Sequence, residues 1–261
     1  MNQNVISVRA SDGSVVKFET HSALQSTVKL ARHYAKIGYP DRYVVFAESR
    51  KRIDDSQKRR AEGERGIYMS CILRPSIFPS QAALISSLAA VAAASALEEH
   101  TEKDMGIGWV SKIYCEGKFI GDITIEGKLD NFTTYEYMII TFSLVLDEKN
   151  FPDRLTDLVK KVFETEHSSV SAIIAKNILN KFLPLYVNIK NNNKFMDVYD
   201  EKFILSGQKI RYLKDGKRHS CRVIGINRAN GSLVAEDSGK NTIYISTPNS
   251  VVIPKKINTK K

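Results

Sequence analysis

Two consecutive segments decide the fold class: GIYMSCILRP at residues 66–75 and ALISSLAAVAAASALEE at residues 83–99. In the first, apolar residues alternate with other side chains, which is the two-residue period of a strand, and Pro75 ends the pattern. The second is an alanine-rich run that is too long for a strand and is typical of a buried helix. A strand followed by a buried helix predicts an α+β domain.

The residues before this pair add strands and a capped helix. Residues 5–20 predict two short strands around the turn SDGS at residues 11–14. Ser26 is placed to cap a helix with apolar residues at helical spacing, and Gly38 lies just past its end. Residues 43–47 form a compact apolar segment that predicts a further strand of the same sheet.

The residues after the pair predict a hairpin that turns at Glu116-Gly117, a long strand and two helices, the second ended by Pro184. The predicted ranges are 108–126, 135–146, 153–166 and 168–183. The polar run KNNNK at residues 190–194 then marks a change of character.

Beyond it, three turn signals separate five short strands, which is typical of a small all-β barrel of about 50 residues. We therefore predict an α+β domain at residues 1–203, the barrel at 204–254 and a basic tail at 255–261.

The composition predicts a globular cytoplasmic protein. The chain is 43% hydrophobic and 26% charged, and its first residues lack the apolar segment of a signal peptide. The most apolar run, residues 82–97, is too short and too rich in serine to cross a bilayer, so no membrane partner is expected. The three cysteines and five histidines are scattered, which predicts reduced thiols and no bound metal.

The net charge of +10 raises nucleic acid as a partner. The tail at residues 255–261 supplies +4 and residues 50–65 supply a further +3. The excess is therefore assigned to a tail and a loop rather than to a folded basic face, which disfavours nucleic acid.

Several segments, in the right order, resemble the biotin–protein ligases, which share a superfamily with the lipoate–protein ligases. They are Ser26-Thr27 at a helix start, YVVFAES at 43–49, GIYMSCILRP at 66–75, the alanine-rich helix ending in ALEE, and IGWVSKIYCEGKFIGDITIE at 107–126. Residues 207–253 resemble the family's SH3-like barrel. The resemblance implies a mixed β-sheet covered by helices on one side, followed by that barrel. It is to the short form of the family, without a DNA-binding domain.

The resemblance implies a reaction in two steps. ATP, with Mg, and biotin condense to an adenylate with release of pyrophosphate, and a lysine of a biotin carrier protein then attacks the acyl carbon. The enzyme contributes mainly positioning and electrostatic support. A homodimer is compatible with this plan.

The family's first motif is a loop, G-R-G-R-x-G-R, that binds phosphate through glycine N–H groups and arginines. Its first four positions here hold IDDS, residues 53–56. A carboxylate repels phosphate, and the loss of one such donor costs roughly 10²–10³ in rate. The neighbouring candidate substrate-binding residues are Ser26, Thr27, Arg50, Lys51 and Arg52.

Two further motifs are also altered. Of the family's K-W-P-N-D only Trp109 remains, and it either contacts substrate or packs in the core. The family's G-x-G-x-N strand reads Thr141, Ser143 and Val145 at its fixed positions. Side chains thus stand where the family keeps bare backbone beside the adenylate.

The motif that holds the family's catalytic lysine, G-K-K-x-x-G, allows two alignments. Without a gap, Phe119 takes the place of the lysine and Asp122 that of the glycine. A shift of one residue, with a compensating bulge such as one at Asp122, puts Lys118 and Gly121 there instead. Because a one-residue slip turns a side chain to the other face of a strand, the two alignments differ in chemistry. Lys118 is the candidate catalytic residue, and Gly121 is a candidate substrate-binding residue.

Three functions stay open. The first is the family reaction, impaired or altered toward another acyl acid. The second is a catalytically inactive homologue that binds a protein partner or a nucleotide, favoured by a pocket plugged by Phe119, Phe142 or Val145. The third is nucleic-acid binding through the basic loop and tail, favoured by basic residues converging on one face with exposed aromatics.

Overall fold

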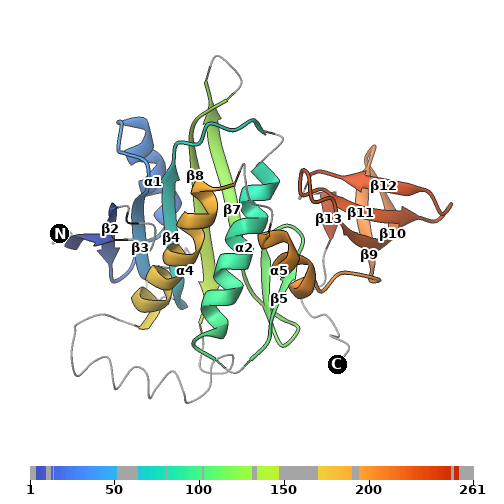
Figure 1. Ribbon diagram of the computed structural model, residues 1–261, viewed down its shortest axis with the longest axis horizontal. Coiled ribbons are helices and arrows are strands. Elements are labelled where there is room, and N and C mark those ends of the chain that lie inside the picture. Colours follow the sequence, from blue (N-terminus) through green and yellow to red (C-terminus); the bar gives the residue numbers. More distant parts are fainter. Residues whose placement is uncertain are drawn as a thin grey trace, which may run out of the picture.

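The computed structural model describes residues 4–9, 13, 15–51, 64–79, 82–101, 103–130, 134–146, 170–189, 194–247 and 250–252. These residues form an eight-stranded sheet with its helices and a separate five-stranded sheet, drawn at the right of Figure 1. The helix predicted at 153–166, residues 52–63 of the predicted loop and the basic tail lie outside the described residues.

The large sheet is mixed, as predicted, with the strand order β1-β2-β3-β4-β8-β7-β6-β5. Its strands are β1 (Asn4–Arg9), β2 (Val15–His21), β3 (Tyr43–Arg50), β4 (Glu64–Leu73), β5 (Met105–Gly108), β6 (Lys112–Cys115), β7 (Lys118–Leu129) and β8 (Tyr135–Val145). Only β2 and β3 pair in parallel; the other neighbouring strands are antiparallel. The predicted hairpin turn at Glu116-Gly117 joins β6 to β7.

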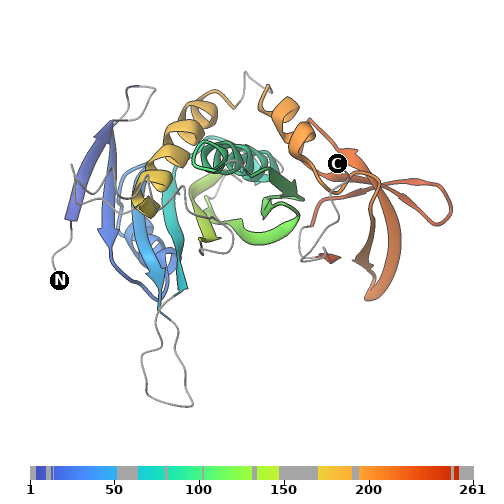
Figure 2. The ribbon, with the colours of Figure 1, turned by 90° about the horizontal axis from the view of Figure 1, so that it is seen from below.

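Helices cover both faces of this sheet, not one side as predicted (Figure 2). Alternate residues of a strand point to opposite faces. Val44 and Phe46 of β3 belong to the larger apolar cluster with α2 (Ala82–Glu98) and α4 (Val170–Val187), whereas Val45 packs against α1 (Thr27–Lys36). Among the described helices, α1 therefore lies alone on the face opposite α2 and α4.

The predicted helix ends are confirmed for α1 but not for α4. Ser26 caps α1, because its Oγ accepts a hydrogen bond from the Lys29 N–H at 3.2 Å. α4 does not stop at Pro184 but continues to Val187. Proline lacks the N–H of a helical turn, and here buried Tyr186, stacked on Phe182, holds the last turn against the core. Among the described residues, no helix is long and apolar enough to cross a membrane.

The small sheet has the five predicted strands, all antiparallel, in the order β12-β11-β10-β9-β13. They are β9 (Lys209–Lys214), β10 (Lys217–Ile226), β11 (Leu233–Asp237), β12 (Thr242–Ile245) and β13 (Val251–Val252). Within the described part of the chain β12 and β13 are two unjoined edges, so the sheet is open, consistent with an SH3-like region. The short helix α5 (Phe195–Lys202), which the sequence did not predict, precedes it.

The two sheets meet at β5, β6 and the start of α2. Trp109 donates from Nε1 to the Gly231 carbonyl at 2.8 Å, and Ile204 N–H donates to the Ile107 carbonyl at 3.1 Å. Gly231 has φ +75°, and a Cβ there would lie 3.0 Å from the Ala83 Cβ of α2. Only glycine suits both the left-handed conformation and this close approach.

Candidate functional site

A pocket of about 210 Å³ opens at the start of α1, on the sheet face that this helix covers. Its lining residues are Leu24, Gln25, Ser26, Thr27, Val28, Arg50, Tyr68, Thr141 and Ser143. The pocket thus brings together three residues predicted to bind substrate, Ser26, Thr27 and Arg50. It also includes Thr141 and Ser143, which stand at two of the family's glycine positions.

A row of three buried hydroxyl groups ends at this pocket: Thr27 and Thr141 line it, and Ser70 lies between them. The Thr27 and Ser70 hydroxyls lie 2.8 Å apart, and the Ser70 and Thr141 hydroxyls lie 2.9 Å apart. Each hydroxyl has one proton to donate and can accept two hydrogen bonds. The two hydrogen bonds use two of the three hydroxyl protons and leave one proton and several lone pairs. The end hydroxyls, those of Thr27 and Thr141, can therefore form hydrogen bonds with a polar ligand.

Arg50 provides the positive charge of the small pocket among the residues that line it. Its guanidinium carbon lies 4.5 Å from the centre of the Tyr68 ring, which is cation–π geometry. Backbone hydrogen bonds on both sides fix this position: Leu24 N–H donates to the Ser49 carbonyl and Lys51 N–H to the Leu24 carbonyl. Lys51 is exposed beside the pocket without lining it, and Arg52 lies outside the described residues.

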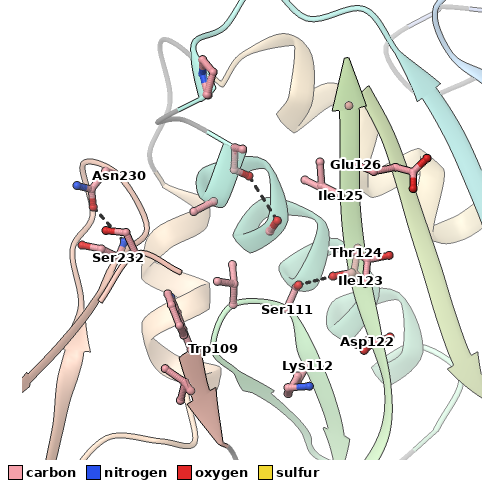
Figure 3. A pocket seen from close by; sticks show the side chains of 18 of the residues that line it. Trp109, Ser111, Lys112, Asp122, Ile123, Thr124, Ile125, Glu126, Asn230 and Ser232 are labelled. Atoms are coloured by element: carbon pink, nitrogen blue, oxygen red, sulfur yellow. Dashed lines mark hydrogen bonds between the residues drawn. The ribbon is translucent and has the colours of Figure 1, made fainter. Parts of the chain in front are cut away.

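A second, larger cleft of about 980 Å³ lies between β7, the start of α2 and the small sheet (Figure 3). The main domain contributes residues of the β5–β6 turn and of β7, among them Trp109, Lys112 and Asp122. The small sheet contributes Asn230, Ser232, Ser246 and Val251. Both domains are therefore needed to form it.

The cleft contains a cation, carboxylates and a hydroxyl group with spare capacity. Lys112 and Asp122 stand opposite each other on β6 and β7, and the Lys112 Nζ lies 5.3 Å from the centre of the Phe119 ring. Glu126, further along β7, forms a two-bond ion pair with Arg32 of α1, at 2.5 and 2.6 Å. The Ser232 hydroxyl is buried and has no hydrogen-bond partner among the described residues. A ligand group or water would satisfy it.

Trp109 is both a core residue and a wall of this cleft. It is 2% exposed and lines the cleft while its Nε1 holds the Gly231 carbonyl. The two sequence-based interpretations of Trp109, packing and substrate contact, are thus compatible in space. The hydrogen bond to the small sheet is a third role that its isolated position in the sequence did not reveal.

Lys118 and Gly121 line neither cavity. Lys118 is exposed at the hairpin end, opposite Cys115, and Gly121 packs against β8, where a Cβ would lie 2.1 Å from the Ser143 carbonyl oxygen. The β7 strand does contain a bulge, but the extra residue is Ile120 rather than Asp122. Phe119 packs edge-on against Tyr114.

The aromatic plug considered from the sequence does not occupy the small pocket. Phe142 is fully buried on the opposite sheet face, 6.1 Å from Phe182 between ring centres. Neither Phe119 nor Val145 is among the residues that line either cavity. The small pocket is lined by both hydroxyl-bearing and apolar side chains, and none of the three proposed plug residues is among them.

Sequence reasoning missed Lys112, Ser232 and Tyr68 as site residues. Lys112 takes the last position of the altered K-W-P-N-D motif. From the sequence it was noted only as a replacement of the family's aspartate, not as a site residue. Ser232 follows a turn signal in the small sheet, and its place in the cleft follows from a contact between domains. Among the described residues there is no group of three His, Cys, Asp or Glu side chains placed to hold a metal ion.

No protein-family model matches the chain. It is 26% identical over 170 residues to the bifunctional ligase/repressor BirA of Bacillus subtilis (strain 168), a match that covers 64% of this chain and 52% of that protein. The chain thus spans about half the length of this curated relative.

The matches to solved structures cover more of the chain, although their sequence identity is lower. A point mutant of the biotin protein ligase from Aquifex aeolicus, in complex with biotin, superposes with a TM-score of 0.65 at 15% identity, covering 90% of this chain and 97% of that one. The ligase from the same organism with biotin and ATP gives 0.64 at 15% identity, with the same coverage. A biotin protein ligase-like protein of unknown function from Silicibacter sp. TM1040 gives 0.60 at 14% identity, covering 88% and 94%. The resemblance predicted from the sequence is confirmed: the chain has the fold of the biotin protein ligases.

Proposed function

We propose that this chain is a biotin–protein-ligase homologue that binds a small carboxylic acid, biotin or another acyl acid, in the pocket at the start of α1. The observation that carries the proposal is the pocket itself. It has Arg50 at one wall, and the row of hydroxyl groups ends at it. A guanidinium group matches a carboxylate with two parallel hydrogen bonds, and the hydroxyls suit the polar head of the same ligand.

The large cleft is the proposed place of ATP, the second substrate of the family reaction. Three features support this: the positive charge of Lys112, the spare hydroxyl of Ser232, and the first turn of α2 at Ala82 and Ala83. The first turn of a helix presents unpaired N–H groups and a partial positive charge to an anion. A carrier-protein lysine would be the acceptor if an adenylate forms.

We propose that adenylation is impaired rather than intact. Lys112 faces Asp122 across the strand pair, so a carboxylate stands beside the cation that would meet a triphosphate, whereas the Glu126 side chain lies on the face that α1 covers. Arg32 neutralises Glu126, but no ion pair between described residues neutralises Asp122. Thr141 and Ser143 also add side chains where the family has glycine.

Calorimetry with biotin, lipoate and shorter acids, followed by ATP–pyrophosphate exchange, tests the proposal. We expect biotin to bind at least about 100-fold more weakly than to a competent ligase, a loss of roughly 2.7 kcal/mol. Arg50→Gln should remove the binding of the preferred acid, while the matched control Lys36→Gln, exposed at the far end of α1, should not. Sub-micromolar biotin affinity with rapid exchange would contradict the impairment. No acid binding at all, with the fold intact, would contradict the pocket.

A further inference from the structure

The outer face of the small sheet collects basic side chains. Along β9, exposed Lys209 and Arg211 alternate with buried residues, and on β10 Arg218 and Arg222 are exposed. The register places Lys209 opposite Arg222, and Arg218 opposite the exposed Leu213. Side chains directly opposite on an antiparallel pair have Cβ atoms about 4.5–5.5 Å apart. Four cations therefore share one face of two neighbouring strands.

Acidic residues hardly offset this charge. Glu236 of β11 stands opposite Arg222, and Arg222 also donates from Nη1 to the Gly207 carbonyl at 2.9 Å. Between described residues, no ion pair joins Lys209, Arg211 or Arg218 to a carboxylate. These three cations are free to meet an anion from outside.

Large apolar side chains lie on the same face. Val252 of β13 pairs with Arg211 and is 61% exposed, and Leu213 is 50% exposed. On β12, Tyr244 is 64% exposed, while its neighbour Ile245 is buried. Alternation along β12 places the Tyr244 ring on the outer face. The face thus combines cations with exposed carbon surface and, two strands away from β10, one aromatic ring.

The sequence concentrates its charge in this part of the chain. Residues 204–261 contain twelve Lys and Arg against three Asp and Glu, whereas residues 1–203 contain 27 against 26. Nine of the ten net positive charges therefore belong to the C-terminal part. Four of these twelve, Lys255, Lys256, Lys260 and Lys261, follow Val252 in the sequence.

We propose that this face binds the sugar–phosphate backbone of a nucleic acid, without reading its sequence. Three of its four cations are arginines, whose planar guanidinium matches two phosphate oxygens at once. The exposed Tyr244 ring offers a surface on which an unpaired base can stack, which favours a single strand over a duplex. The proposal is independent of the function of the two cavities, because none of these side chains lines either of them.

Fluorescence anisotropy with labelled single-stranded and duplex oligonucleotides, over a series of salt concentrations, tests it. Each phosphate contact with a single strand contributes about 0.7 to the slope of log K against log salt. The double variant Arg211→Gln/Arg218→Gln should lower that slope by about 1.4 and weaken binding at low salt by about tenfold or more. Tyr244→Ala should weaken the single strand more than the duplex, because stacking contributes roughly 1–3 kcal/mol per base.

A variant with the same loss of charge elsewhere separates the face from the net charge. Arg9→Gln/Lys36→Gln changes two exposed cations on β1 and α1. It should bind the oligonucleotide like the unaltered chain. Equal weakening in both double variants would overturn the proposal, as would poly-glutamate or anionic vesicles that compete as well as the oligonucleotide. Circular dichroism confirms that each variant is folded.

Discussion

The small pocket and the outer face of the small sheet place their polar groups in opposite ways. In the pocket, the hydroxyls of Thr27, Ser70 and Thr141 are buried and bond to one another. On the outer face, Lys209 and Arg211 point into solvent. A buried polar group without a partner costs roughly 1–3 kcal/mol, whereas an exposed charge costs almost nothing. A substitution in the pocket should therefore lower both stability and ligand binding, whereas one on the outer face should lower ligand binding alone.

The largest effect is expected at Trp109, which connects the two sheets. Trp109→Ala removes a fully packed ring and its hydrogen bond to Gly231, so the free energy of unfolding should fall by about 3–5 kcal/mol. Trp109→Phe keeps most of the packing and should cost much less, mainly the hydrogen bond at about 1 kcal/mol. Denaturant titration followed by circular dichroism measures both. An unchanged midpoint in Trp109→Ala would mean that the sheets are held together by other contacts.

The second-largest effect is a difference between two lysine substitutions in the same hairpin, Lys112→Ala and Lys118→Ala. Lys112 lines the large cleft and Lys118 does not. Lys112→Ala should lower any pyrophosphate exchange by roughly 10²–10³-fold and weaken ATP binding in calorimetry. Lys118→Ala should change neither, and its stability should stay within about 0.5 kcal/mol because the side chain is exposed.

A loss of exchange in Lys118→Ala but not in Lys112→Ala would favour the alignment in which Lys118 carries the catalytic charge. It would require the hairpin end to turn toward the cleft when the substrates bind. Phe119→Ala serves as the matched variant, because Phe119 packs between the two lysines, against Tyr114 and beneath Lys112. A loss of exchange in Phe119→Ala alone would mean that packing, not charge, determines the activity.

The third effect compares the two regions directly. Ser70→Ala removes the middle of the hydroxyl row and leaves the buried Thr27 and Thr141 hydroxyls without that partner, so it should cost about 1–3 kcal/mol. Arg218→Gln on the outer face should stay within about 0.5 kcal/mol. Thermal unfolding of both variants measures the difference. Equal stability would contradict the expected difference between a buried hydroxyl and an exposed charge.

The smallest effect is a pH dependence at the end of α2. Hydrogen bonds from Asn177 and Lys181 of α4 lower the pKa of Glu99. A carboxyl group with a lowered pKa in the folded state adds stability above its unfolded pKa of about 4.3, and that stability is lost as the pH falls through the folded value. Glu99→Gln should remove roughly 0.5 kcal/mol at pH 7 and progressively less as the pH falls below about 4.

His100 beside it must be separated from this effect. Burial lowers the pKa of His100, so its contribution is present above about pH 6.5 and fades as the pH falls below that value. His100→Gln should therefore flatten the stability curve near pH 6, and Glu99→Gln should flatten it near pH 4. Chemical unfolding across this range distinguishes the two.

Periodicity and turn chemistry predicted most of the fold. The strand at residues 66–75 and the Ser26 cap depend on local patterns, and both are present in the structure. Predictions that depended on long-range packing were less successful. Pro184 ends a helix by local rules, yet α4 runs through it because Tyr186 packs against the core. The placement of α1 opposite α2 and α4 was also missed, since no local pattern specifies a sheet face.

Local sequence patterns singled out residues of the small pocket but few of the large cleft. Ser26, Thr27 and Arg50 all line the small pocket, and their role in substrate binding stays a prediction. The cleft depends on Ser232, which is more than one hundred residues from Lys112 in the chain. The basic face was overlooked for a different reason: its cations alternate with apolar residues along β9 and β10, so no run of like charge reveals them.

The close approach of Gly231 to Ala83 makes the width of the large cleft adjustable from one position. The walls of the cleft belong to the two sheets. They can approach this closely only because Gly231, which faces Ala83, has no side chain. Gly231 is not among the residues that line the cleft, so Gly231→Ala changes no lining residue. Because the added methyl group does not fit, the substitution must move the turn that carries Asn230 and Ser232 away from α2. Engineering the chain to accept a bulkier molecule in the cleft can therefore begin at Gly231 rather than at a residue that lines the cleft.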